Sequence, residues 1–242
     1  MKALTFITAI LLLVTGCTNA ATGDKKTGEQ KKPPARAVVS EFLTDTTFTF
    51  SGCETGKLPD GWSQYYTGRK GETPRWEVVN DNGNKVLAQL SKDNPNYHFN
   101  VVVYDGFITK NVELKVKIKG VSGRMDQGGG FVWRFTDAGN YYVVRANPLE
   151  DNVVMYKVVN GKRTDLPLMG KGRTYGTDVP PLGNGWNELR LRVKDSLFTV
   201  YLNGKELFKV IDKTFTNAGK TGLWSKADAV SWFDDFQISK IK

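Results

Sequence analysis

Two arginines interrupt a pair of apolar, aromatic runs near the middle of the chain. The stretch GGGFVWRFTDAGNYYVVRANPLEDN, residues 128–152, places Arg134 in the first run and Arg145 in the second. A guanidinium group carries five N–H donors in a fixed plane and binds carboxylate and hydroxyl oxygens. Two such groups on one sheet face could line a sugar-sized binding surface. Alternatively, each arginine covers a solvated face and pairs with an acid such as Glu150 or Asp151, and the sequence leaves both interpretations open.

A turn at residues 137–140 would set the register of these two runs as an antiparallel hairpin. It pairs Arg134 with Val143 and makes Arg145 the diagonal neighbour of Arg134, roughly 7–8 Å away at the backbone. Because side chains alternate between the two faces, Tyr141 joins both arginines on a face that we expect to be exposed. The opposite face is predicted to be core, with the residues Phe131, Trp133, Phe135, Tyr142 and Val144.

Alternating runs elsewhere predict an all-β fold. VELKVKI (112–118) and ELRLRVK (188–194) alternate apolar with charged residues, which is typical of strands with one buried and one wet face. Asn160-Gly161 and Asn203-Gly204 each lie between two apolar runs and predict two-residue hairpin turns. Many short strands at this spacing predict a two-sheet antiparallel sandwich or jelly roll.

Composition limits the number of domains and the class of partner. The chain has 242 residues, of which 40% are apolar, enough for one sizeable core. The formal net charge of +9 suggests an anionic partner. The basic residues are scattered through strands and turns, however, which favours a mildly basic surface over nucleic-acid binding. We therefore expect one domain and no nucleic-acid partner.

The N-terminal stretch MKALTFITAILLLVTGC predicts export. Its apolar run is too short to span a bilayer and is typical of a secretory signal. Its ending resembles the lipobox of bacterial lipoproteins, in which the chain is cut before the cysteine, here Cys17, and the thiol carries the lipid. The resemblance implies a signal peptide at 1–16 and a protein anchored to the cell envelope by lipid alone. Thr18 stands where an Asp would favour retention in the inner membrane, so an outer-membrane anchor is expected if the cell has one.

A tether is predicted to follow the lipidated cysteine. Residues 17–37 contain no large apolar side chain, so they cannot form a core and are expected to be flexible. The domain is therefore predicted at 38–242. With Cys17 lipidated, Cys53 has no disulfide partner and is predicted to be a small packed apolar residue.

Five stretches occur in an order that resembles the concanavalin A-like lectin/glucanase superfamily. The most similar group is the domain of unknown function 1080, now called the 3-keto-disaccharide hydrolase family. The stretches are LPDGW (58–62), VLAQLSKDN (86–94), residues 128–166, residues 185–208 and GKTGLWSKADAVSWFDDFQI (219–238). The resemblance covers nearly all of residues 45 to 242. It implies a jelly roll, a concanavalin A-like sandwich, with a concave face that binds carbohydrate.

The resemblance also implies candidate catalytic residues. Family members are associated with cleaving 3-keto-glycosides by elimination and hydration, usually with a divalent metal. His98 and Glu150 could supply the base, Glu150 could instead hold the metal, and Lys226 stands where members often carry a polar site residue. Trp224 could stack on a sugar ring. The alternatives are a strand histidine bonded to a carbonyl, a turn acid, a surface lysine and a core tryptophan.

An ordinary glucanase is not expected. Those enzymes carry a Glu-x-Asp-x-x-Glu strand that holds two carboxylates roughly 5–5.5 Å apart, and this sequence has no such strand. The related jelly-roll glucanases commonly hold a structural calcium through an Asp on the last strand. Asp234 in FDDFQI matches that Asp, and Glu54 is its expected partner, with oxygen ligands that suit calcium. The alternative is an exposed acidic turn.

The sequence thus supports two main functions. The first is a lipid-anchored domain of the cell envelope that binds carbohydrate through a concave sheet face. The second is a metal-assisted 3-keto-glycoside hydrolase or lyase that uses the same face. A structural or protein-interaction lipoprotein is a third interpretation.

Overall fold

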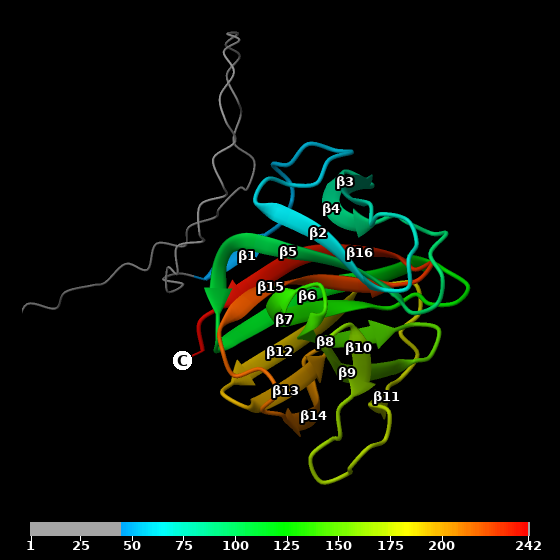
Figure 1. Ribbon diagram of the computed structural model, residues 1–242. Coiled ribbons are helices and arrows are strands. Elements are labelled where there is room, and N and C mark those ends of the chain that lie inside the picture. Colours follow the sequence, from blue (N-terminus) through cyan, green and yellow to red (C-terminus); the bar gives the residue numbers. More distant parts are fainter. Residues whose placement is uncertain (1–44, 242) are drawn as a thin grey trace, which may run out of the picture.

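The computed structural model describes residues 45–241, and every regular element in that range is a β-strand (Figure 1). The strands form two antiparallel sheets that pack as a sandwich, so the predicted all-β jelly roll is confirmed. No helix in residues 45–241 is long and apolar enough to cross a membrane.

Each sheet contains eight strands. Sheet A runs, in spatial order, through β14 (Lys205–Ile211), β13 (Leu197–Leu202), β12 (Asn187–Lys194), β6 (Val112–Ser122), β16 (Val230–Ser239), β4 (Asn84–Gln89) and β3 (Trp76–Asp81), with β1 (Thr46–Phe48) also paired to β16. Sheet B runs through β10 (Lys162–Asp165), β9 (Asn152–Val159), β8 (Asn140–Asn147), β7 (Gly129–Asp137), β15 (Gly219–Lys226), β5 (His98–Thr109) and β2 (Trp62–Gly68), with β11 (Thr177–Asp178) paired to β9.

Alternating strands and tight turns explain how sheet A forms. The apolar residues of β6 and β12 point into the core between the sheets while their charged neighbours point outward, as the alternation predicted. Asn203 and Gly204 join β13 to β14 with φ values of 48° and 80°, the left-handed backbone that a two-residue turn requires. Asn160 and Gly161 join β9 to β10 in the same way, with φ values of 50° and 77°.

Sheet B is rolled so strongly that its concave face encloses a second apolar cluster. This cluster contains Phe99, Val101, Val103, Val132, Phe135, Tyr141, Val143, Val154, Tyr156, Val158 and Trp224. Arg163 of β10 lies 4.7 Å from the ring centre of Phe99 on β5, although five strand spacings separate β10 from β5 in the sheet. On a flat sheet that separation would be roughly 24 Å, at about 4.8 Å per strand. The roll therefore brings distant strands into contact across the concave face.

A bulge in β7 changes the register predicted for the β7–β8 hairpin. The predicted register holds at the turn, where Asp137 lies opposite Asn140, but it shifts between Trp133 and Asp137. Within the shifted segment Arg134 adopts a left-handed φ of 49°, as a bulged residue can. Beyond the bulge Gly130, and not Val132, lies opposite Arg145.

The bulge also moves one predicted core residue to the other face. Phe131, Trp133, Tyr142 and Val144 do lie in the core between the sheets. Phe135 packs instead in the concave cluster, beside Tyr141 at 5.6 Å between ring centres. The predicted pairing of Arg134 with Val143 was therefore wrong, because it allowed for no extra residue in β7.

Candidate functional site

Arg134 does not lie on the concave face with Arg145. Its side chain is 2% exposed and donates to three backbone carbonyls, those of Phe215 at 2.6 Å, Lys110 at 3.1 Å and Asp195. Burial lowers the pKa of this guanidinium. Arg134 is four residues along β7 from Gly130, the residue opposite Arg145, so about 13 Å separates the two backbone positions. The two arginines therefore cannot bind one sugar-sized group together, and Arg134 ties three turns at the far end of the sandwich.

Arg145 lies on the concave face and forms an ion pair. Its Nη2 is 2.6 Å from Oε2 of Glu150, and only 2% of its side chain is exposed against 37% for Glu150. The same guanidinium donates to the Asn152 side chain and, at 3.3 Å, to the Tyr156 hydroxyl. Pairing of Arg145 with Glu150, which the sequence left open, is thus confirmed.

This ion pair changes the acidity of both partners. Partial burial favours neutral Glu150, but the charge of Arg145 and hydrogen bonds from Arg145 and Asn152 outweigh it and hold the pKa of Glu150 below its usual value. Burial likewise opposes the charge on Arg145, but Tyr156, Glu150 and other acidic neighbours raise the pKa of Arg145. Both groups are therefore charged at neutral pH.

A second ion pair lies beside the first. Lys226 at the end of β15 places Nζ 3.0 Å from Oδ2 of Asp126, and these side chains are 12% and 2% exposed. A Cβ added at Gly128 would lie 2.8 Å from Oδ1 of Asp126 and 3.3 Å from Cδ of Arg145, so Gly128 separates the two pairs. Arg145, Glu150, Lys226 and Asp126 are called the charge cluster below.

Backbone hydrogen bonds to two side chains fix the loops that carry the charge cluster. The Asp228 carboxylate accepts from the N–H groups of Arg124 at 2.7 Å, Met125 at 3.0 Å and Asp126 at 3.1 Å. Oδ1 of Asn147 accepts from the N–H groups of Gln127 at 3.3 Å and Leu149 at 3.1 Å. The acidic members of the cluster are therefore held in place by the backbone on either side of them.

Three exposed side chains are linked to the charge cluster: Met125 precedes Asp126, Leu149 precedes Glu150, and the Tyr175 hydroxyl is bonded to that of Tyr156, which accepts from Arg145. Met125, Leu149 and Tyr175 are 49%, 48% and 48% exposed. Tyr175 belongs to the segment between β10 and β12 that projects at the bottom of Figure 1, and its hydroxyl accepts from the Tyr156 hydroxyl at 3.1 Å. The site therefore combines paired charges and hydroxyls at its base with apolar groups at its rim.

Tyr141 and Trp224 lie on the concave face but offer no surface to a ligand. Both are fully buried in the concave cluster. The Tyr141 hydroxyl is 2.9 Å from the Thr67 hydroxyl, and burial raises the pKa of Tyr141. Arg163 lies over Trp224, 5.8 Å from its ring centre. Stacking of Trp224 on a sugar ring was expected, but the roll of the sheet covers this ring.

His98 belongs to the other face of sheet B. It is fully buried, its Nδ1 is 2.8 Å from the carbonyl oxygen of Arg69, and its ring stacks on Tyr66 at 4.9 Å between ring centres. The alternative of a strand histidine bonded to a backbone carbonyl therefore describes it. Of the three predicted catalytic residues, the structure brings together only Glu150 and Lys226.

The residues predicted to hold calcium, Asp234 and Glu54, each have another partner in the structure. Asp234 accepts from the Asn84 side chain at 2.8 Å and from the backbone N–H of Asp235, and burial raises the pKa of Asp234. Glu54 forms a surface ion pair with Lys57 at 2.8 Å. Within residues 45–241 no group of three or more His, Cys, Asp or Glu side chains is arranged to hold a metal ion.

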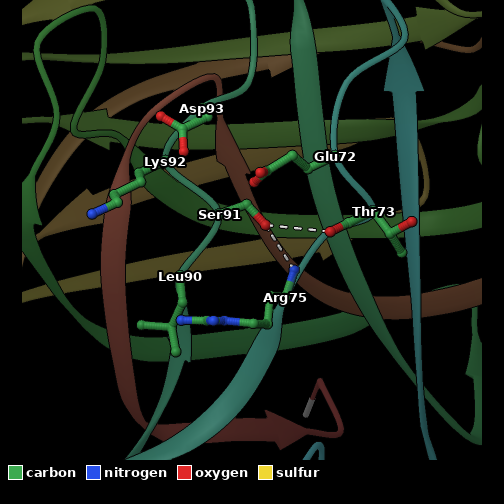
Figure 2. Close-up of a pocket in the computed structure, with 7 residues that line it drawn as sticks. All are labelled: Glu72, Thr73, Arg75, Leu90, Ser91, Lys92 and Asp93. Atoms are coloured by element: carbon green, nitrogen blue, oxygen red, sulfur yellow. Dashed lines mark hydrogen bonds between the residues drawn. The ribbon is translucent and has the colours of Figure 1, made fainter.

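A separate groove of about 350 Å³ lies between two loops (Figure 2). Glu72, Thr73 and Arg75 line one side, and residues 90–93 line the other. The Ser91 hydroxyl at its centre accepts from the Arg75 N–H at 2.9 Å and is 3.4 Å from the Thr73 carbonyl. The negative charges of Glu72 and Asp93 balance the positive charges of Arg75 and Lys92, and the Ser91 hydroxyl is already hydrogen-bonded. The concave face is therefore the stronger candidate for a binding site.

Several residues of the concave face were missed from the sequence. Asp126 and Tyr175 lie in loops, where no periodicity marks a side chain as part of a site. Tyr156 alternates with Val154 and Val158 and could have been assigned to their face. Arg163 follows a recognised turn, but only the roll of sheet B places it over the aromatic residues.

The comparisons with known proteins give the fold. No family model matches the chain, and no curated protein sequence matches it either. The carbohydrate-binding module CBM66 from Bacillus subtilis is 19% identical, with a TM-score of 0.55 over 74% of this chain and 96% of that one. The exoplasmic/lumenal domain of VIP36, in a Ca2+/Man-bound form, is 10% identical, with a TM-score of 0.54 over 82% and 90%.

What the chain shares with both is a fold. At these identities the similarity extends to the two-sheet sandwich and no further. The resemblance to the domain of unknown function 1080 has no matching family model and stays a prediction.

Proposed function

We propose that the protein binds carbohydrate at the end of the concave face that holds the charge cluster. The observation that supports this most directly is the pair of adjacent ion pairs, at 2.6 and 3.0 Å, beneath an apolar rim. Adjacent hydroxyls of a sugar both donate and accept hydrogen bonds, so they match neighbouring cations and carboxylates. A rim of Tyr175, Leu149 and Met125 supplies contact for the apolar C–H face of a sugar ring. The module from Bacillus subtilis is named for carbohydrate binding and the VIP36 domain is described in a Ca2+/Man-bound form; both have a similar fold, which favours the proposal.

Binding is favoured over 3-keto-glycoside hydrolysis. Glu150 has its pKa held low by Arg145 and is therefore a weak base, and His98 is buried on the other face. We expect 3-keto disaccharides to stay intact when incubated with the protein and divalent metal, as followed by mass spectrometry.

Two variants test the site. Tyr175→Ala changes a side chain that is 48% exposed, and Glu150→Gln keeps the shape of a 37% exposed side chain and an oxygen that can accept from Arg145. Both variants should fold, with some loss of stability in Glu150→Gln, and circular dichroism checks this before binding is measured. On a glycan array with residues 38–242, each should weaken sugar binding at least tenfold because a charged acceptor or a rim contact is lost. Glu113→Gln, which breaks a similar pair with Arg190 on sheet A at 3.5 Å, is the control and should bind normally. Unchanged binding by both site variants would overturn the proposal.

Export and lipid anchoring through Cys17 form the second part of the proposal. Residues 1–37, which contain the predicted signal and tether, lie outside the described residues 45–241. The lipobox-like sequence supports an anchor in the cell envelope, with a tether that lets the domain reach glycans. Cys17→Ser should abolish metabolic labelling of the chain with fatty acid and release it from the membrane fraction. Normal labelling of that variant would refute the anchor.

A further inference from the structure

Arg163 lies over an aromatic surface on the concave face. Its guanidinium carbon is 4.3 Å from the ring centre of Tyr156, 4.7 Å from that of Phe99, 5.8 Å from that of Trp224 and 6.0 Å from that of Tyr97. Contacts with ring faces orient a guanidinium and satisfy its charge in part, but they leave its N–H donors free for another partner.

The charge on Arg163 is not balanced by an acid. Arg145 and Lys226 on the same face pair with Glu150 and Asp126, whereas no carboxylate in the described part of the chain forms an ion pair with Arg163. Its Nη1 is buried without a hydrogen-bond partner. A buried donor left unbonded is costly and uncommon in a folded protein, so this group calls for an acceptor.

Tyr156 connects Arg163 to the charge cluster. Its ring lies under the guanidinium of Arg163, and its hydroxyl accepts from Nη2 of Arg145 at 3.3 Å. The unpaired cation and the hydroxyl-binding cluster therefore contact opposite parts of one side chain. The exposed side chains next to this connection are Glu150, 37% exposed and paired with Arg145, and Tyr175, 48% exposed and bonded to the Tyr156 hydroxyl.

We propose that the concave face selects an acidic sugar, a uronic acid residue whose carboxylate is bound by Arg163. This inference rests on the proposed carbohydrate-binding function and specifies its ligand. The carboxylate supplies the missing acceptor and charge, while Glu150, the exposed member of the charge cluster, and the Tyr175 hydroxyl bind the ring hydroxyls. Because Arg163 is half-buried and its guanidinium is held against the rings of Tyr156 and Phe99, the group is oriented before the ligand arrives.

The test compares uronate polymers with the same polymers after carboxyl reduction. Polygalacturonate, alginate and hyaluronan keep their linkages when their carboxylates are reduced to hydroxymethyl groups, so the two forms differ only at the carboxylate that Arg163 is proposed to bind. We expect residues 38–242 to bind at least one native polymer ten or more times more tightly than its reduced form, by isothermal titration calorimetry. Arg163→Met should lower affinity for the native polymer to that for the reduced polymer and leave the latter unchanged.

Arg190→Met is the matched control. Arg190 also stacks on a tyrosine, Tyr201 at 3.8 Å, but on sheet A, so its removal changes the net charge equally and should not affect binding. If Arg190→Met lowered the affinity for the native polymer as much as Arg163→Met, the polymer would be bound by nonspecific attraction to the basic surface, and the inference would be overturned.

The wild-type comparison keeps the test valid even if Arg163→Met does not fold. Equal binding of native and reduced polymers would overturn the acidic-sugar inference and leave the carbohydrate-binding function standing. If the protein bound no glycan on the array, acidic or neutral, both would fail.

Discussion

Arg145 is tolerated in the concave face because its charge is matched on every side. A guanidinium that is 2% exposed would destabilise the fold if it were unpaired, but it has Glu150 at 2.6 Å, the Asn152 side chain and the Tyr156 hydroxyl. The cost of burial is thus offset by partners that also fix the position of the group. The same pairing makes Glu150 important for stability as well as for binding.

Acid should therefore weaken the fold partly through Glu150. The folded-state pKa of Glu150 lies below its ordinary value of 4.5, so its stabilising contribution is complete above that pH and is lost as pH falls through the folded-state pKa. The melting temperature, followed by circular dichroism from about pH 7 to about pH 3, should fall less steeply below pH 4.5 in Glu150→Gln than in the wild type. Some of the slope should remain, because the pKa of Asp212 is also lowered.

Glu113→Gln serves as the comparison for that acid titration. Its pair with Arg190 is longer, at 3.5 Å, and about a third exposed, so its loss should barely alter the slope. If the melting temperature fell with pH in the same way in the wild type and in Glu150→Gln, Glu150 would not contribute to the acid sensitivity of the fold.

The bulge in strand β7 gives Arg134 and Arg145 different roles, although the sequence suggested that they line one binding surface. Arg145 serves the concave face, while Arg134, turned by its φ of 49°, ties the turns that carry Lys110, Asp195 and Phe215. The bulge thus uses a charged residue to satisfy carbonyls at the end of the sandwich.

Arg134→Ala should destabilise the domain without affecting sugar binding. It leaves three carbonyls without their donor in a buried setting, which should cost about 2–4 kcal/mol of unfolding free energy. Urea unfolding followed by tryptophan fluorescence measures this loss, and Arg190→Ala, at a pair that is about a third exposed, should cost under about 1 kcal/mol. Loss of binding in a folded Arg134→Ala protein would show that Arg134 belongs to the site after all.

Strand patterns explain why the register of sheet A could be predicted and that of β7 could not. In β6 and β12 one face is wet, so apolar and charged residues alternate and identify the buried side. In β7 and β8 nearly every residue is buried, because the roll of sheet B gives the second face a core of its own. Without alternation, the sequence carries no mark of the extra residue at Arg134.

At the scale of the whole molecule, the sandwich and the tight turns were predictable, and the roll of sheet B was not. A turn such as Asn203-Gly204 depends on two adjacent residues, and a strand with one buried face can be recognised from a few consecutive residues that alternate between apolar and charged. The roll depends on contacts such as Arg163 with Phe99, between strands that are far apart in the sheet. This is why Glu150 and Lys226 could be proposed from the resemblance, while Arg163 could be recognised only in the structure.

The order of strands has a consequence for how the chain is made. β15 and β16 come last among the described strands, yet β15 lies between β7 and β5 in sheet B, and β16 lies between β6 and β4 in sheet A. Until residues 219–239 have left the ribosome, each sheet is divided into pieces with unpaired edges. At roughly 5–20 residues per second, the emerging chain exposes these edges for many seconds, a state prone to aggregation. The nascent protein is therefore expected to need a chaperone until its last two strands emerge, when both sheets can close together.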